Sequence, residues 1–366
     1  MIIIVQPWFS AFGHPAQSLL NLAKIIGKHS DITYLISILN DNIDDSIEIA
    51  RKELKSYGQV IDYPVKTSSV REGTIKSLAS LKRLFTSKML IEKVFFLDAH
   101  LVLLSVLWPF YCPSNIKQLG VVYLLGPEKI IQNSVVKYFV GKFLQRKEVV
   151  LFLRTDELML DWQKAFPRAQ IKCLPSLEIP PDEAPIMAKE NSLNEIRLGI
   201  LGQIRLGKGL EWIVPIFKNN SSLGQLTVAG AFSHAAAQKS LSFLKDFDGF
   251  EEKFLSESEL LHLASEQDYL LMLYDDWDER MEGAVMFLAA RVNRPVIVYD
   301  KGWCGRMVNK YENGMFAPLG PDDFSLFVKA LPLPDSEEYE ALLRGVLAFK
   351  NAHTGKSIRK AFLDVI

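Results

Sequence analysis

One short loop of the sequence combines three glycines with two cations, GQIRLGKG at residues 202–209. It follows the apolar run IRLGIL and precedes LEWIVPIF, which has the pattern of an amphipathic helix. A glycine-rich loop between a parallel strand and a helix turns backbone N–H groups and the positive helix end toward an anion. Arg205 and Lys208 would neutralise a diphosphate bound there. Taken alone, the loop is explained equally well as a tight turn with solvated basic side chains.

A second loop has residues that suit the sugar and the phosphate of such a ligand. A strand pattern ends at Tyr274, and after a polar loop Glu282 and Gly283 open a helix of small residues. A carboxylate accepts hydrogen bonds from sugar hydroxyls, and a bare glycine N–H at a helix N-terminus donates to phosphate. We therefore expect Glu282 and Gly283 to form one site with Arg205 and Lys208.

These loops, in this order, resemble the donor-binding domain of the GT-B glycosyltransferases, specifically the large retaining group 1 family. The family pattern Gly-Arg-Leu-x-x-x-Lys-Gly is matched by Gly202, Lys208 and Gly209, and NRPVIVYD at 293–300 follows the later Gly-x-Pro-Val-Ile segment. The resemblance covers most of residues 195–330 and, more loosely, the N-terminal half. It implies an α/β fold with two Rossmann-like, doubly wound domains that face a central cleft.

The resemblance also implies an activity. The chain is expected to transfer a sugar from a nucleotide diphosphate sugar to a glycan acceptor, retaining the anomeric configuration and using no metal or other cofactor. Arg205 and Lys208, with amides near Gly283, would stabilise the leaving diphosphate. Glu282 would orient the donor sugar, and Gly202 would lie against the donor.

Two departures from the family pattern leave other functions open. Gln203 stands where the family has an arginine, so the diphosphate role would move to Arg205, and the family's Glu-x7-Glu is absent. A non-catalytic partner subunit or sugar-binding module would tolerate both changes. A nucleotide-sugar epimerase shares the architecture, although its paired acids and histidines are not evident in this sequence.

Two segments of the N-terminal half are further candidates. Gly13 and His14 lie in a loop after the first strand pattern, which in the family lies beside the donor phosphate and the acceptor; a helix-capping turn explains them equally well. Asp98 and His100 end the pattern KVFFLDAH, at the edge where open α/β sheets bind ligands. The resemblance implies a catalytic His100, with His14 and Asp98 on the acceptor side. Alternatively, Asp98 and His100 are a hydrogen-bonded pair that starts a helix.

The sequence DDWD at 275–278 contains an Asp-x-Asp, which binds a divalent metal in a different glycosyltransferase architecture. Here it lies beside a loop that already supplies two cations for a diphosphate. We therefore expect a solvated acidic loop rather than a metal site.

The arrangement of these candidates depends on the elements around them. Strand patterns are IIIVQP, ITYLIS, KVFFLD, VVYLL and VVLFLR in the first half, and IRLGIL, QLTVAG, DYLLMLY and RPVIVYD in the second. Helical patterns separate them, which indicates parallel sheets covered on both faces. The pattern stops in the proline-rich stretch 174–194. For 366 residues we expect an acceptor-binding domain at 1–180, a donor-binding domain at 181–345, and a helix at 346–366 that packs outside or reaches back to the first domain.

Charge is distributed unevenly along the chain. Residues 1–180 have 22 Lys and Arg against 16 Asp and Glu, whereas the remainder has 20 against 27. The basic stretches 66–90 and 134–147 either lie on an anionic membrane surface or are solvated helix faces. The basic first half also favours an acceptor carried on a lipid.

Cysteine usage indicates the compartment. The three cysteines have neither a metal-binding nor a disulfide spacing, which is typical of a reducing environment. We expect a cytoplasmic protein, peripheral on the inner face of a membrane if the basic stretches contact lipid, and no nucleic-acid partner.

Overall fold

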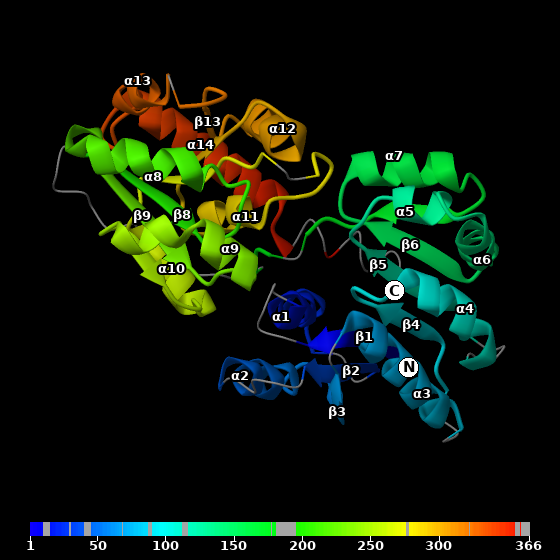
Figure 1. Cartoon of the computed structure of the whole chain (residues 1–366). Helices are drawn as coiled ribbons and strands as arrows, with labels where there is room; N and C mark the ends of the chain where they lie inside the picture. The colour runs from blue at the N-terminus through cyan, green and yellow to red at the C-terminus, as the bar shows by residue number, and fades with distance from the viewer. Residues whose placement is uncertain are drawn as a thin grey trace. The chain divides into compact units, whose positions relative to one another are not determined.

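The computed structural model describes residues 1–9, 15–28, 31–39, 45–67, 69–86, 90–111, 116–176, 178–180, 195–275, 278–321, 323–355 and 359. The chain forms two compact units: Met1–Pro181 together with Thr354–Ile366, and Asp182–His353. Each unit has its own parallel sheet and its own buried core (Figure 1).

The first unit contains a parallel sheet whose central strands are buried on both faces. In the described ranges it has seven strands in the order β3-β2-β1-β4-β5-β6-β7. These are β1 (Ile2–Phe9), β2 (Ile32–Leu39), β3 (Gln59–Thr67), β4 (Lys93–Phe96), β5 (Gln118–Tyr123), β6 (Val149–Leu153) and β7 (Gln170–Cys173). Central strands such as β6, VVLFL, are continuously apolar because helices cover the sheet from both sides.

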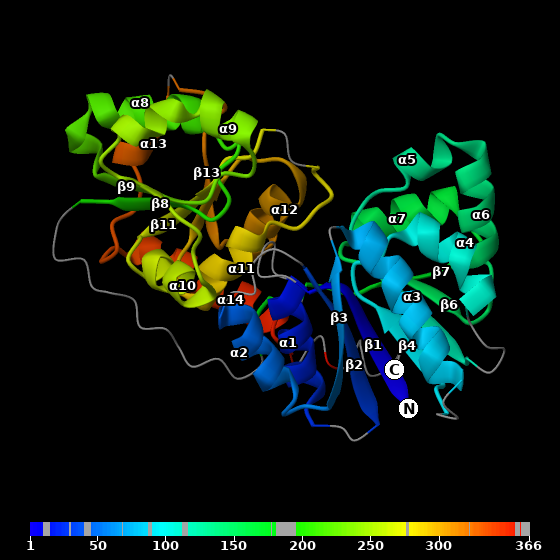
Figure 2. The same cartoon turned by 60° about the horizontal axis from the view of Figure 1, so that its bottom comes forward.

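Helices form a layer on each face of this sheet (Figures 1 and 2). They are α1 (Pro15–Ile26), α2 (Asp45–Leu54), α3 (Val70–Thr86), α4 (Leu101–Tyr111), α5 (Glu128–Ile131), α6 (Ser134–Leu144) and α7 (Asp156–Ala165). One core joins α1 and α2 to one face, and another, with Trp108 and Trp162, joins α3, α4, α6 and α7 to the other.

The second unit repeats the same strand order. Its described residues form six parallel strands, β10-β9-β8-β11-β12-β13. They are β8 (Arg197–Leu201), β9 (Gln225–Gly230), β10 (Phe250–Glu252), β11 (Tyr269–Met272), β12 (Val296–Val298) and β13 (Gly314–Phe316).

The helices of the second unit also lie on both faces (Figure 2). They are α8 (Leu210–Asn219), α9 (Ala235–Ser240), α10 (Glu257–Ser265), α11 (Ala284–Arg291), α12 (Gly302–Tyr311), α13 (Phe324–Lys329) and α14 (Glu337–Ala352), with short 3-10 helices at Ser221–Leu223 and Ser242–Asp246. Trp212 on α8 packs edge-on against Phe324 on α13. Across the sheet, Phe287, Trp303 and Phe349 join α11, α12 and α14.

This strand order creates a switch point in each sheet. β1 lies between β2 and β4, and β8 lies between β9 and β11. The connections that follow β1 and β4 therefore cross opposite faces of the first sheet, and those that follow β8 and β11 cross opposite faces of the second. Ligands of open α/β sheets bind at the carboxyl ends of the strands beside such a point. The loops after β8 and β11 are therefore the first place to look for a site in the second unit, and the residues after β1 and β4 in the first.

The most hydrophobic stretch of the sequence, 94–112, is divided between a strand and a helix. Its described part forms β4, a short connection that contains the polar Asp98 and His100, and α4. Nowhere in the described ranges does a helix have both the length and the apolar character needed to cross a membrane.

Candidate functional site

The loop after β8 is fixed by hydrogen bonds to the end of β9. The N–H groups of Gly202 and Ile204 donate to carbonyls there at 3.0 and 2.8 Å. Gly202, Gly207 and Gly209 have φ values of 89°, 73° and 70°, which residues with a Cβ rarely adopt. A Cβ added at Gly202 would meet no heavy atom within 4 Å. The glycines thus permit the turn into α8, and the space beside Gly202 is open.

The loop after β11 lies directly against this glycine loop. The N–H of Asp275 donates to the carbonyl of Gly207 at 2.9 Å. The guanidinium of Arg205 lies 5.4 Å from the centre of the Tyr274 ring, and the ammonium of Lys208 lies 5.9 Å from it. The two cations from one loop thus meet on an aromatic ring from the other.

Lys208 is buried, with 7% of its surface exposed. Burial, and the like charge of Arg205 beside it, lower the pKa of Lys208 to about 7. Burial also raises the pKa of the Tyr274 hydroxyl, so that residue stays neutral. An anion between the two cations would favour the charged form of Lys208, since opposite charge stabilises an ammonium.

Gly283 allows α11 to begin beside the Tyr274 ring. It occupies the N-cap position of α11, where no side chain caps the helix. A Cβ on Gly283 would lie 2.4 Å from Cε of Met272, 2.9 Å from Sγ of Cys304 and 3.9 Å from the Tyr274 ring. Only glycine therefore fits without displacing these neighbours, and the helix N-terminus lies next to the ring that contacts both cations.

Glu282 precedes this helix start and is partly exposed. Burial raises the pKa of the Cys304 thiol to about 12, and the negative charge of Glu282 adds to that effect. Glu282 is next to Gly283 in the sequence and so belongs to the loop that leads into α11. The structure brings together Arg205, Lys208, Gly283 and Glu282, which the sequence separates into two loops.

The acidic loop at 275–278 is described only at its two ends. Arg280 donates from Nε and Nη2 to the Asp278 carboxylate at 2.9 and 2.7 Å, which lowers the pKa of Asp278. Asp275 is exposed at its other end. Within the described ranges, no group of three or more acids, histidines or cysteines is arranged to hold a metal.

In the first unit, Asp98 follows β4 with a left-handed backbone, φ 55°. Its carboxylate accepts a long 3.5 Å hydrogen bond from Nε2 of Gln6 on β1. Burial raises the pKa of Asp98, although the positive charge of Arg154 opposes the shift. Asp98 thus lies at the carboxyl edge of the sheet, at the β1/β4 switch point.

His100 caps the N-terminus of α4. Its Nδ1 accepts from the backbone N–H of Leu103 at 3.3 Å, and the backbone N–H of His100 donates to the Thr74 hydroxyl at 3.0 Å. Burial, with the charge of Arg71, lowers the pKa of His100. The imidazole is therefore neutral near pH 7, with its proton on Nε2, because Nδ1 is an acceptor. One alternative from the sequence is a hydrogen-bonded pair of Asp98 and His100 that starts a helix. His100 does start α4, but the hydrogen bond of Asp98 is to Gln6.

Gly13 and His14 lie outside the described residues, so their assignment stays a prediction. Two residues that the sequence patterns did not single out, Tyr274 and Arg154, lie at the carboxyl edges. Tyr274 follows β11 and the buried Leu273, and Arg154 directly follows the buried strand β6. Position immediately after a buried parallel strand is the signal that would have identified both.

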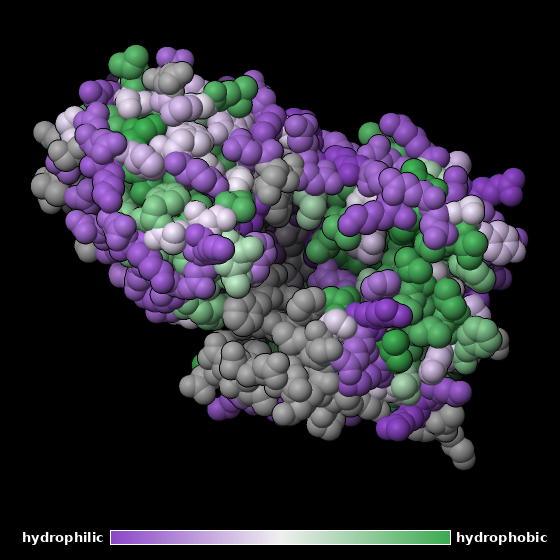
Figure 3. Space-filling view, in the orientation of Figure 1, coloured by the Kyte–Doolittle hydropathy of each residue, from purple (hydrophilic) through white to green (hydrophobic). Residues whose placement is uncertain are grey.

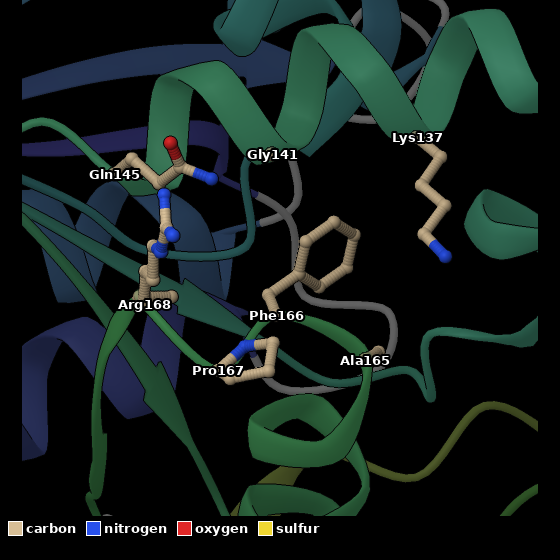
Figure 4. A pocket seen from close by; sticks show the side chains of 8 residues that line it. Lys137, Gly141, Gln145, Ala165, Phe166, Pro167 and Arg168 are labelled. Carbon is tan, nitrogen blue, oxygen red and sulfur yellow. The ribbon is translucent and has the colours of Figure 1, made fainter.

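The first unit also has a pocket at the opposite edge of its sheet, about 280 Å³ in volume. α6 and the segment between α7 and β7 line it, through Lys137, Gly141, Gln145, Phe166 and Arg168 among others. Figure 4 shows Lys137 at one end, Gln145 and Arg168 together at the other, and Phe166 between them. Because this segment precedes β7, the pocket lies at the amino edge, away from Asp98 and His100.

Comparison with known proteins gives matches in structure alone. No protein-family model matches the sequence, and no curated protein matches it. The structure of Anabaena HepE in complex with UDP-glucose matches with a TM-score of 0.67 at 12% identity, over 100% of this chain and 98% of that one. WaaG, a glycosyltransferase involved in lipopolysaccharide biosynthesis, matches with a TM-score of 0.67 at 15% identity, over 100% and 99%.

A protein of a different activity also matches. A UDP-N-acetylglucosamine 2-epimerase has a TM-score of 0.61 at 12% identity, over 100% of this chain and 96% of that one. At such identities the similarity shows the fold, not the reaction. The chain has the GT-B fold, with two Rossmann-like α/β domains, which confirms the fold class expected from sequence. The central cleft between the domains stays a prediction.

Proposed function

We propose that this chain transfers a sugar from a nucleotide diphosphate sugar to a glycan acceptor, free or carried on a lipid. The observation that carries the proposal is the pair of cations, Arg205 and Lys208, on the Tyr274 ring at the carboxyl edge of the second sheet. Two like charges at one ring, one of them buried, favour an anion with more than one charge. A nucleoside diphosphate meets that requirement.

In the proposed reaction, the bond between the anomeric carbon and the diphosphate oxygen breaks. The acceptor hydroxyl oxygen bonds to the same carbon, and its proton passes to the departing diphosphate oxygen. Negative charge grows on the leaving diphosphate, where Arg205, Lys208 and the amides at the start of α11 would stabilise it. Each such group is worth about 100-fold to 1,000-fold in rate when it is aimed at developing charge.

These cations occupy the role that a divalent metal has in other sugar transferases, so we propose a metal-independent reaction. Retention of the anomeric configuration rests on the sequence resemblance. Glu282 would orient hydroxyls of the donor sugar, and the open space at Gly202 would admit the donor.

The first unit would supply the acceptor side. His100 is the proposed catalytic residue, through its Nε2 proton, and Asp98 is an acceptor-side residue with an elevated pKa. Gly13 and His14 have their proposed roles from the resemblance. Domain closure would exclude water, which otherwise competes with the acceptor for the donor.

The proposal is tested by incubating the protein with a panel of nucleotide sugars and measuring release of nucleoside diphosphate. UDP-glucose is the first donor to try, because it is bound in the HepE structure. Slow release without acceptor, which Arg205→Ala abolishes, supports the transferase. Binding without release indicates a sugar-binding module or partner subunit.

A nucleotide-sugar epimerase is the second candidate, because an epimerase is among the structural matches. Its product is another nucleotide sugar of unchanged mass, and no acceptor is needed. Proton NMR of the recovered donor separates the two reactions, since only an epimerase inverts a sugar carbon while the diphosphate bond stays intact.

A further inference from the structure

Helix α4 has an unusual composition for a helix on the surface of a unit. Its sequence, LVLLSVLWPFY, contains no charged residue. Leu101, Leu104 and Trp108 face the core, yet Val106 and Phe110 on the other side are exposed, Phe110 by 74%. A helix that is apolar all round is normally covered on every side. The outer side of α4 is therefore suited to a partner.

Helix α6 extends the apolar surface. α6 packs against α4, and its outer residues Val135, Tyr138 and Phe139 are exposed, the first two by 62% and 60%. Figure 3 shows hydrophobic side chains gathered over this part of the first unit, with hydrophilic ones around them. We call the exposed residues Val106, Phe110, Val135, Tyr138 and Phe139 the α4–α6 face. A contiguous apolar surface of this kind marks an interaction site more often than a solvated one.

The border of the α4–α6 face is cationic. Residues 70–147, which include α3 to α6, have twelve Lys and Arg against four Asp and Glu. The ammonium of Lys142 lies 5.8 Å from the centre of the Tyr138 ring, and that of Lys82 lies 5.4 Å from the Tyr111 ring. Cations are thus held near the apolar face by aromatic rings of α4 and α6.

The pocket on α6 adds a second group of cations beside this face. Lys137 lines it, next in sequence to Tyr138, together with Arg168 and Gln145 (Figure 4), and no carboxylate is among its lining residues. Arg168 with the amide of Gln145 at one end of the pocket, and Lys137 at the other, are donors for headgroup phosphates.

We infer that the α4–α6 face docks on an anionic lipid bilayer, with its apolar side chains in the acyl boundary and Lys137 and Lys142 at headgroup phosphates. An apolar centre with a basic rim is the pattern that binds anionic membrane surfaces. A second copy of this chain fits less well, because a twofold contact would bring the same basic rims together.

Of the two basic stretches considered for a membrane surface, 134–147 contains α6 and belongs to the proposed surface, whereas 66–90 does not supply its apolar part. The helix there is α3, and its Leu78 and Leu81 belong to the buried core. α3 therefore contributes charges such as Lys82 and Arg83 to the rim, while the apolar contact comes from α4 and α6. The inference does not depend on the proposed sugar transfer, because it concerns another surface of the first unit.

Vesicle flotation tests the inference with the full chain. Vesicles of phosphatidylcholine alone are compared with vesicles of equal parts phosphatidylcholine and phosphatidylglycerol. The protein should float with the anionic vesicles, less so in high salt, and hardly with the neutral ones. Failure to float with anionic vesicles overturns the inference, whatever the result of the donor assay.

Two variants locate the contact. Phe110→Ser should reduce partitioning onto anionic vesicles about tenfold through lost apolar burial, whereas Leu326→Ser, a matched change at a 69% exposed leucine of α13, should not. Lys137→Gln with Lys142→Gln should reduce it about 20-fold or more, whereas Lys218→Gln with Lys239→Gln, both exposed on the second unit, should not. Circular dichroism verifies that each variant is folded.

The same variants separate the bilayer from other partners. If Phe110→Ser floats like the unchanged protein, the α4–α6 face is not the contact and the inference is wrong. If the protein is a dimer in lipid-free solution and Phe110→Ser makes it monomeric, the face is an interface between copies, and the inference is equally overturned.

Discussion

The ammonium of Lys208 lies 5.9 Å from the centre of the Tyr274 ring. Lys208 belongs to the loop after β8 and Tyr274 follows β11, so this contact joins the two loops at the switch point of the second sheet. Arg205 approaches the same ring at 5.4 Å. The ring thus attracts two cations that repel one another, which prepares the loop for a multiply charged anion.

Removing either cation should remove most of the transferase activity. For Arg205→Ala and Lys208→Ala we expect kcat/KM to fall about 100-fold or more, because each cation stabilises charge that develops on the leaving diphosphate. Steady-state kinetics with the active donor measures this effect. Lys218→Ala, at an exposed position on α8, is the control and should be unchanged. Full activity in both site variants would remove the proposed diphosphate site.

Donor binding should weaken as the pH rises above about 7. Lys208 has a pKa of about 7 in the free protein, so at higher pH it must take up a proton before it can pair with the diphosphate. The dissociation constant should rise by up to about tenfold for each pH unit above 7. Calorimetric titration with a nucleotide sugar is suitable, since its diphosphate is fully ionised throughout this range.

Lys208→Arg separates this proton effect from a general effect of pH. Arginine stays charged, so the variant should bind the donor with little change between pH 6 and 9. A variant with the same pH dependence as the unchanged protein would show that another group titrates.

Replacing Tyr274 tests the role of the ring. Tyr274→Leu should raise the KM for the donor about 30-fold or more, because each of the two cations loses an attraction of about 1 kcal/mol or more. Tyr274→Phe keeps the ring and should have nearly the original KM. If Tyr274→Phe and Tyr274→Leu have the same KM for the donor, the ring does not position the cations. Any change in Tyr274→Leu would then come from packing alone.

His100 can be tested for catalysis apart from its capping of α4. Asn is a good N-cap residue, so His100→Asn should keep the stability of the protein while losing the imidazole. His100→Ala should lower the free energy of unfolding by about 1 kcal/mol. Chemical denaturation and kcat together decide the matter: a stable His100→Asn variant with undiminished kcat would leave His100 as a structural residue only.

The sequence predicts the centre of each sheet well and the edges poorly. VVYLL and VVLFLR predict β5 and β6 because both faces of these strands are buried, so the run is apolar throughout. The four strands without such a run, β3, β7, β10 and β13, are all at sheet edges. β7 alternates between exposed and half-buried residues, and β10 and β13 have three residues each. Their pairing depends on a neighbouring strand that local sequence does not reveal.

Part of the site was predictable because its residues flank strands and helices that the sequence pattern reveals. Arg205, Lys208, Glu282 and Gly283 follow or precede recognisable elements, so their gathering at one sheet edge could be expected. Tyr274 was missed because it continues the apolar pattern DYLLMLY and has the appearance of a core residue, although its position directly after the buried strand segment is a signal for it. Only the turn of the glycine loop, through three positive φ values, places both cations on its ring.

Thermal unfolding with a panel of nucleoside diphosphates and nucleotide sugars tests the central claim most directly. At least one, with UDP and UDP-glucose tried first, should raise the unfolding temperature of the unchanged protein, since a ligand that binds only the folded state stabilises it. The shift should be largely lost in Arg205→Ala and Lys208→Ala. No stabilisation by any member of the panel, or an equal shift in both variants, would contradict a donor diphosphate bound by these two cations.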